Sequence, residues 1–140
     1  MKAVSTRLIG AWRLLSYETL DHTGRRGKPY AAAVGRLTYD EHGNMSGQVM
    51  RPDRARVEVG KGNAQTVRAA YIGYIAYFGS YEVAPDGTSV VHHVEGALNP
   101  EWVGGKQVRK LRFEGDLLVL SADVRKAGEI VTHTLIWERY

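Results

Sequence analysis

Short runs of alternating apolar and polar residues, separated by turn residues, extend along almost the whole chain. This pattern is typical of an all-β barrel or sandwich, in which successive side chains point to opposite faces of the sheet. Eight strands are expected, over residues 11–20, 35–40, 44–50, 76–83, 88–98, 106–115, 116–124 and 129–140. A ninth, short strand is expected over Arg56–Val59. Because the connections are mostly short, the pattern predicts an antiparallel, 8–9-stranded up-and-down barrel.

One segment, residues 64–75, changes from the strand period to the helix period. Its apolar residues recur at i, i+3, i+4 and i+7, namely Val67, Ala70, Tyr71 and Tyr74. Asn63 precedes it as an N-cap, since its side chain can accept an early helix N–H. We therefore predict one short helix, with Tyr71, Tyr74 and Tyr77 as the stripe that packs the helix against the barrel.

Turn geometry predicts which residues of the strands point inward. A two-residue Asp86-Gly87 turn pairs Val83 with Val90 and therefore Tyr81 with His92. Two opposed valines suit a buried face, so Tyr81 and His92 are expected inside and their neighbours His93 and Glu95 outside. In residues 106–115 the inward set is Arg109, Leu111 and Phe113.

The same reasoning applies to the hairpin around His42-Gly43. A two-residue turn there pairs Tyr39 with Ser46 and Leu37 with Gln48, and in the last strand Leu135 and Trp137 bring His133 to the inner face. The predicted interior is therefore unusually polar, and burying polar groups is costly unless they pair with each other, water or a ligand. This favours a binding cavity, with Trp102 near its mouth. The expected ligand-binding residues are Tyr39, Ser46, Gln48, Met50, Trp102 and His133.

Composition narrows the class of protein. The 140 residues suit one domain spanning residues 1–140, and a hydrophobic fraction of 44% and a charged fraction of 24% are ordinary for a globular protein. The net charge of +4 is modest and its basic residues are scattered, which argues against nucleic-acid binding. There is no cysteine, no apolar stretch of about 18 residues and no signal-peptide pattern, so we expect a cytoplasmic protein that does not span a membrane.

The His92-His93 pair raises the question of a metal site. Adjacent strand residues point to opposite faces, so these two imidazoles cannot chelate one ion together. His93 and Glu95 share a face, but no third ligand is evident. We therefore expect no metal and no other cofactor.

Two residues allow both a structural and a functional interpretation. His92 is either a buried, hydrogen-bonded core histidine or a group that moves a proton. Arg109 either lies at the barrel rim with its head in water or anchors a carboxylate or enolate oxygen. If the protein is an enzyme, the candidate catalytic residues are His92, Tyr81 and Arg109.

Several segments, finally, resemble a known family. Gly10-Ala11-Trp12 matches the G-x-W element that opens lipocalin barrels, and the chain closes with Trp137-Glu138-Arg139, where lipocalins place a basic residue against that tryptophan. The runs GAWRLLSYE, YDEHGNMSGQVMRP, YIAYFGSYEV, HHVE, PEWVGGKQVRKL and LIWERY are similar to the bacterial and fungal lipocalin-like domain family. The resemblance spans Leu8 to Tyr140. It implies a short lipocalin-type barrel, sometimes used in natural-product pathways, with Trp12 and Arg139 in contact.

The sequence thus predicts a barrel that holds a small, mostly apolar molecule. The alternative is a cofactor-free isomerase, cyclase or lyase acting on a polyketide- or terpenoid-like substrate inside the same barrel. Either form is expected as a monomer or homodimer.

Overall fold

The computed structural model describes residues 3–140, and almost all of its secondary structure is strand. The elements in chain order are α1 (Val4–Leu8), β1 (Gly10–Asp21), β2 (Arg26–Gly27), β3 (Val34–Tyr39), β4 (Asn44–Met50), α2 (Ala64–Ile72), β5 (Tyr74–Val83), β6 (Ser89–Ala97), the 3-10 helix η1 (Pro100–Trp102), β7 (Lys106–Glu114), β8 (Leu117–Lys126) and β9 (Glu129–Arg139). The predicted strands are therefore confirmed, apart from Arg56–Val59, which lies in an irregular segment.

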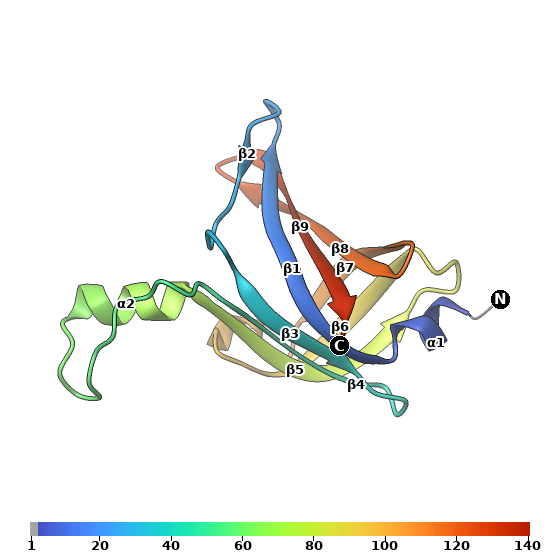
Figure 1. Cartoon of the computed structure of the whole chain (residues 1–140), viewed down its shortest axis with the longest axis horizontal. Coiled ribbons are helices and arrows are strands. Elements are labelled where there is room, and N and C mark those ends of the chain that lie inside the picture. Colours follow the sequence, from blue (N-terminus) through green and yellow to red (C-terminus); the bar gives the residue numbers. More distant parts are fainter. Residues whose placement is uncertain (1–2) are drawn as a thin grey trace.

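The strands form one antiparallel sheet in which each pairs with the next, and β1 also pairs with β9 along Trp12–Asp21. This last pairing closes the sheet into an eight-stranded barrel, and the two-residue β2 lies beside the far end of β1. Figure 1 shows the strands wrapping around a common axis, with α2 standing out to one side. The predicted up-and-down barrel is confirmed, although residues 3–140 contain two α-helices rather than one.

One end of the barrel is sealed by α1 and the first residues of β1. Leu8 and Trp12 are fully buried there, and Trp12 Nε1 donates to the Leu8 carbonyl at 2.9 Å. The Arg139 guanidinium lies 4.2 Å from the centroid of the Trp12 ring, which confirms the expected contact, and it also donates to the Ile9 carbonyl at 2.8 Å. Gly10 permits this approach, since its φ is +135° and an added Cβ would lie 2.5 Å from Arg139 Nη1.

The apolar core occupies this sealed half of the barrel. A bulge between Leu14 and Ser16 shifts the register of β1, so that Trp12, Leu14 and then Tyr17 all face inward. Leu118, Leu120 and Trp137 of the neighbouring strands β8 and β9 belong to the same core. The other half, where β4, β6 and β8 end, is filled less completely and contains the cavity described below.

The hairpin between β3 and β4 differs from the prediction. Tyr39 pairs with Met45, because the loop has three residues, Glu41 to Gly43, rather than two. Asp40 Oδ1 accepts from the backbone N–H groups of His42 and Asn44, and Gly43 takes a φ of +85°, as the third position of such a loop requires. One extra loop residue turns every side chain of β4 to the opposite face.

The predicted inward orientation of three β4 residues is therefore wrong. Ser46 and Gln48 are exposed on the outer face and Met50 lies on that face as well, while Met45 and Val49 face inward.

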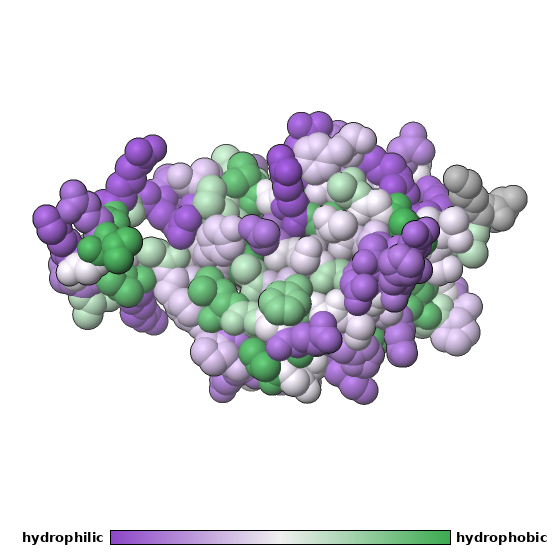
Figure 2. All heavy atoms as spheres, turned by 90° about the horizontal axis from the view of Figure 1, so that it is seen from below, coloured by the Kyte–Doolittle hydropathy of each residue, from purple (hydrophilic) through white to green (hydrophobic). Residues whose placement is uncertain are grey.

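The helix α2 begins as predicted but does not pack on the barrel. Asn63 Oδ1 accepts from Thr66 N–H at 2.8 Å, which confirms the N-cap, yet α2 has no buried residue. The predicted packing stripe is wrong, because the helix ends at Ile72 and the residues that follow belong to β5. Figure 2 shows an apolar patch on this projecting part, where Val59, Val67 and Ile72 are exposed, bordered by hydrophilic side chains.

Candidate functional site

A cavity of about 390 Å³ lies inside the barrel, in the half away from α1. This volume is typical of small-molecule sites, which span roughly 300–1,000 Å³. Its apolar wall comprises Leu37, Gly47, Val49, Ile75, Leu120, Ala122, Val124, Leu135 and Trp137. Its polar and aromatic wall comprises Tyr17, Tyr77, His92, Trp102, Gln107, Arg109 and His133, with Gln48 contributing from β4.

His92 is the centre of a buried hydrogen-bonded chain. It lies on the inner face of β6, opposite Tyr81 as predicted, and is 2% exposed. Its Nε2 lies 2.6 Å from Tyr39 Oη and its Nδ1 lies 2.6 Å from Tyr77 Oη. Both ring nitrogens are therefore occupied by phenol groups, one in the core and one at the cavity wall.

Burial determines the charge state of this chain. It lowers the pKa of His92 to about 3, with a further contribution from the positive charge of Arg109. Burial also raises the pKa of Tyr39 well above its usual value, and it raises that of Tyr77, where the charge of Arg109 opposes the effect. At neutral pH the imidazole is uncharged and both tyrosines keep their protons.

A second polar pair lies on another part of the wall. Tyr17 Oη and His133 Nδ1 are 2.7 Å apart, bridging β1 and β9. Burial raises the pKa of Tyr17 to about 12 and lowers that of His133, with Arg109 contributing to the latter. His133 thus points inward, as expected.

The positive charge of Arg109 acts on both sets of hydrogen-bonded side chains, the one around His92 and the Tyr17–His133 pair. Arg109 lies on the inner face of β7, as predicted, and donates to Gln107 Oε1 at 3.0 Å and to the Val108 carbonyl at 3.1 Å. None of the ion pairs between residues 3 and 140 involves it. A half-buried guanidinium without a carboxylate partner is suited to an oxygen atom of a bound molecule.

Trp102 lies on the cavity wall in the connection between β6 and β7. It belongs to η1, whose N-cap is Asn99, and its ring meets that of Tyr77 edge-on at a centroid distance of 6.0 Å. Because flat aromatic rings favour such edge and stacked contacts, this part of the wall is suited to another ring.

Of the remaining candidates, Gln48 borders the cavity, whereas Tyr39, Tyr81, Ser46 and Met50 do not. Tyr39 lies beneath His92 in the core, and Tyr81 points inward at the sealed end, where it packs on Tyr39 and donates to the Asp40 carbonyl. Ser46 and Met50 lie on the outer face, and the Gln48 side chain accepts from Tyr74 Oη there. His93 and Glu95 point outward as predicted, and His93 pairs with Glu82.

The sequence reasoning missed Tyr77, which lies at the cavity end of the His92 chain. It was assigned to the helix stripe, whereas β5 begins at Tyr74. The strand period was the available signal: counting back in twos from the inward Val83 and Tyr81 reaches Gly79 and Tyr77. Tyr17 was missed because the bulge in β1 interrupts the same period.

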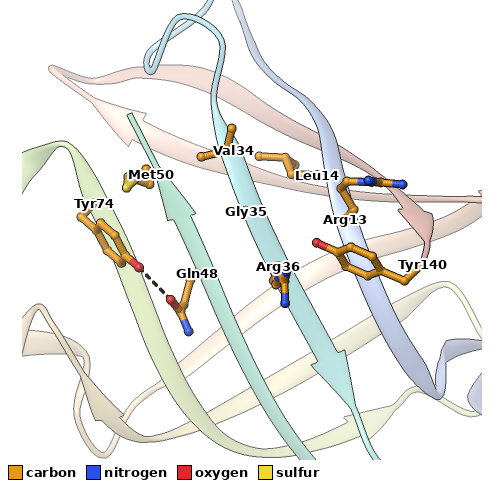
Figure 3. A pocket seen from close by; sticks show the side chains of 9 residues that line it. All are labelled: Arg13, Leu14, Val34, Gly35, Arg36, Gln48, Met50, Tyr74 and Tyr140. Atoms are coloured by element: carbon orange, nitrogen blue, oxygen red, sulfur yellow. Dashed lines mark hydrogen bonds between the residues drawn. The ribbon is translucent and has the colours of Figure 1, made fainter. Parts of the chain in front are cut away.

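A second hollow lies on the outside of the barrel, where β1 and β3 diverge (Figure 3). Tyr140 lies between Arg13 and Arg36 there, with each guanidinium 4.9 Å from the ring centroid. Val34 and Met50 form the apolar part of its floor. It is more open to solvent than the inner cavity.

Within residues 3–140, no three His, Cys, Asp or Glu side chains converge as a metal site would require. None of the helices found in this range has the length and apolar character needed to cross a bilayer.

The closed barrel, the Gly10–Trp12–Arg139 closure and the inner cavity define a protein of lipocalin type. The chain belongs to the lipocalin-like domain family, whose model matches residues 9–140. It is similar to the 4'-hydroxy-3'-methoxypropiophenone carrier protein ppsC of Aspergillus oryzae. The two are 37% identical over an alignment of 87 residues, and the match covers 55% of this chain and 78% of the fungal protein.

Proposed function

We propose that this protein is a carrier that holds a small aromatic molecule inside its barrel. The observation behind this proposal is the cavity itself, which combines an apolar wall with a few fixed polar groups. The similarity to a fungal carrier of a small aromatic ketone supports the same conclusion.

The geometry around His92 favours binding over catalysis. A general base must have a free nitrogen within hydrogen-bond reach of the ligand, and both nitrogens of His92 are already bonded to tyrosines. Its low pKa also makes it a poor proton acceptor. These features argue against the isomerase, cyclase or lyase alternative with His92 as its base.

The proposal is tested by isothermal titration calorimetry with 4'-hydroxy-3'-methoxypropiophenone as the probe. We expect saturable binding with one molecule per chain. Ala122→Phe places a ring in the cavity, since Ala122 lines it from β8, and should weaken binding by about tenfold or more.

Ala11→Phe is the matched control, because Ala11 lies exposed on the outer face of β1 and the substitution adds the same ring outside the cavity. It should leave the affinity unchanged, and circular dichroism should report the same strand content for both variants. Absence of saturable binding, or equal affinities of wild type and Ala122→Phe, would overturn the proposal.

A further inference from the structure

Three side chains connect the core to the cavity wall in a fixed order: Tyr39, His92 and Tyr77. Tyr39 is 1% exposed and lies outside the cavity, whereas Tyr77 lines it. Because this series of hydrogen-bonded side chains begins in the core and ends at the cavity, the direction of its hydrogen bonds can be worked out.

A neutral imidazole has one N–H donor and one acceptor nitrogen, so His92 donates to one tyrosine and accepts from the other. Within the described chain, His92 Nε2 is the one hydrogen-bond partner of Tyr39 Oη. If Tyr39 accepted this bond, its own proton would be buried without an acceptor, which is costly. Tyr39 therefore donates to Nε2, and the proton of His92 is on Nδ1.

The Nδ1–H of His92 then donates to Tyr77 Oη, 2.6 Å away. In this bond the Tyr77 hydroxyl oxygen is the acceptor, so the hydroxyl proton of Tyr77 points away from His92. No other acceptor for it is found among residues 3–140. The proton is consequently available to a molecule in the cavity.

Arg109 lines the same cavity as Tyr77, near enough for its charge to lower the pKa of this hydroxyl, and it has no carboxylate partner in the described residues. A guanidinium can only donate hydrogen bonds. Tyr77 and Arg109 thus present protons to the same part of the cavity, and a ligand group there has to accept them.

We propose that Tyr77 and Arg109 form a subsite for the carbonyl oxygen of a small aromatic ketone, and that Tyr39 and His92 are positioning residues for it. This assignment rests on the proposed carrier function and specifies its ligand class. A ligand that lacks an acceptor oxygen leaves both donors unpaired, so the subsite discriminates against it. The aromatic wall next to Tyr77, formed by Trp102, is suited to the ring of such a ketone.

The first test needs no ligand. Long-range ¹H–¹⁵N NMR of the ¹⁵N-histidine-labelled protein reports which nitrogen of His92 bears the proton, with His92→Gln identifying the resonances. We expect the proton on Nδ1 in wild type and a mixture of tautomers in Tyr39→Phe, which removes the donor to Nε2. A proton on Nε2 in wild type would overturn the proposal, whatever the protein binds.

The second test compares 4'-hydroxy-3'-methoxypropiophenone with 2-methoxy-4-propylphenol, which has a methylene in place of the carbonyl. Wild type should prefer the ketone by about tenfold, and Tyr77→Phe should reduce this preference to about twofold or less. Tyr74→Phe is the matched control, because its hydroxyl lies on the outer face of the same strand and bonds to Gln48 (Figure 3).

The outcomes separate the two proposals. Equal binding of both compounds by wild type, or a preference that survives in Tyr77→Phe, overturns the carbonyl subsite and leaves the carrier function in place. If neither compound binds to wild type, both proposals fail.

Discussion

At the scale of single residues, the main feature is a histidine kept neutral inside a barrel. His92 is surrounded by Tyr39, Tyr77 and apolar side chains, and no carboxylate in the described chain lies close enough to stabilise a charged imidazole. Protonation in the folded state would bury a charge next to Arg109, which is unfavourable. This has a direct consequence for stability in acid.

The free energy of unfolding should fall as the pH is lowered below the ordinary pKa of histidine. The folded pKa of His92 is about 3, so between pH 6.5 and 3 the unfolded chain binds a proton that the folded chain does not. Stability therefore rises with pH across this window. From pH 6.5 to 5, where carboxylates change little, His92 should account for a loss of about 1–2 kcal/mol.

Urea denaturation at a series of pH values measures this slope. In His92→Gln the slope between pH 6.5 and 5 should become clearly shallower, whatever the absolute stability of the variant. His93→Gln is the control, because His93 lies one residue along on the outer face beside Glu82 and should keep the wild-type slope. An unchanged slope in His92→Gln would show that its imidazole is not buried neutral.

At the scale of elements, the barrel depends on how its first and last strands meet. Arg139 of β9 packs on Trp12 and donates to the Ile9 carbonyl, across the space left by Gly10. Gly10 has a φ that residues with a side chain rarely adopt. This position is therefore restricted both by its backbone conformation and by the contact with Arg139.

Gly10→Ala should therefore lower the free energy of unfolding by about 2 kcal/mol or more. Gly24→Ala is a suitable comparison, since Gly24 also has a positive φ of +86° but nothing within 4 Å of an added Cβ. It should cost about 1 kcal/mol. Equal losses in the two variants, measured by urea denaturation, would mean that the contact with Arg139 does not contribute.

Two hairpins illustrate what turn residues can predict. Around Asp86-Gly87 the assumed pairing was correct, so Tyr81, His92 and Arg109 were placed on the correct face. Around His42-Gly43 the assumption of a two-residue turn was wrong by one residue, which reversed Ser46, Gln48 and Met50. The residues around this turn are compatible with both loop lengths. The longer loop is favoured by the Asp40 side chain, which accepts hydrogen bonds from backbone N–H groups of the loop.

Helix α2 and Tyr77 show a different limit. Apolar residues at helical spacing predicted that α2 packs on the barrel, but the helix projects from it (Figure 1). Because the spacing continues past Ile72 into β5, the same pattern concealed the boundary between helix and strand. The inward position of Tyr77 depends on that boundary, and a periodicity alone does not locate it.

At the scale of the whole molecule, the sequence predicted the barrel, its closure and the existence of a polar-lined cavity. It could not predict the arrangement of the polar groups, since the Tyr39–His92 and Tyr17–His133 contacts join strands that are far apart in sequence. Apolar packing fills the sealed half of the barrel, and residues such as Leu37, Leu120 and Trp137 belong both to this core and to the cavity wall, so the wall of the cavity is also part of the structure that stabilises the barrel.

The most direct test of the account is where 4'-hydroxy-3'-methoxypropiophenone contacts the protein. Isotope-filtered NOE spectroscopy of the ¹³C-labelled protein with the unlabelled compound should give contacts from its ring protons to the methyl groups of Ala122, Leu120 and Leu135, inside the barrel. Contacts to Val34 and Met50 in the outer groove instead, or no contacts at saturating ligand, would contradict the conclusion that the barrel interior is the binding site.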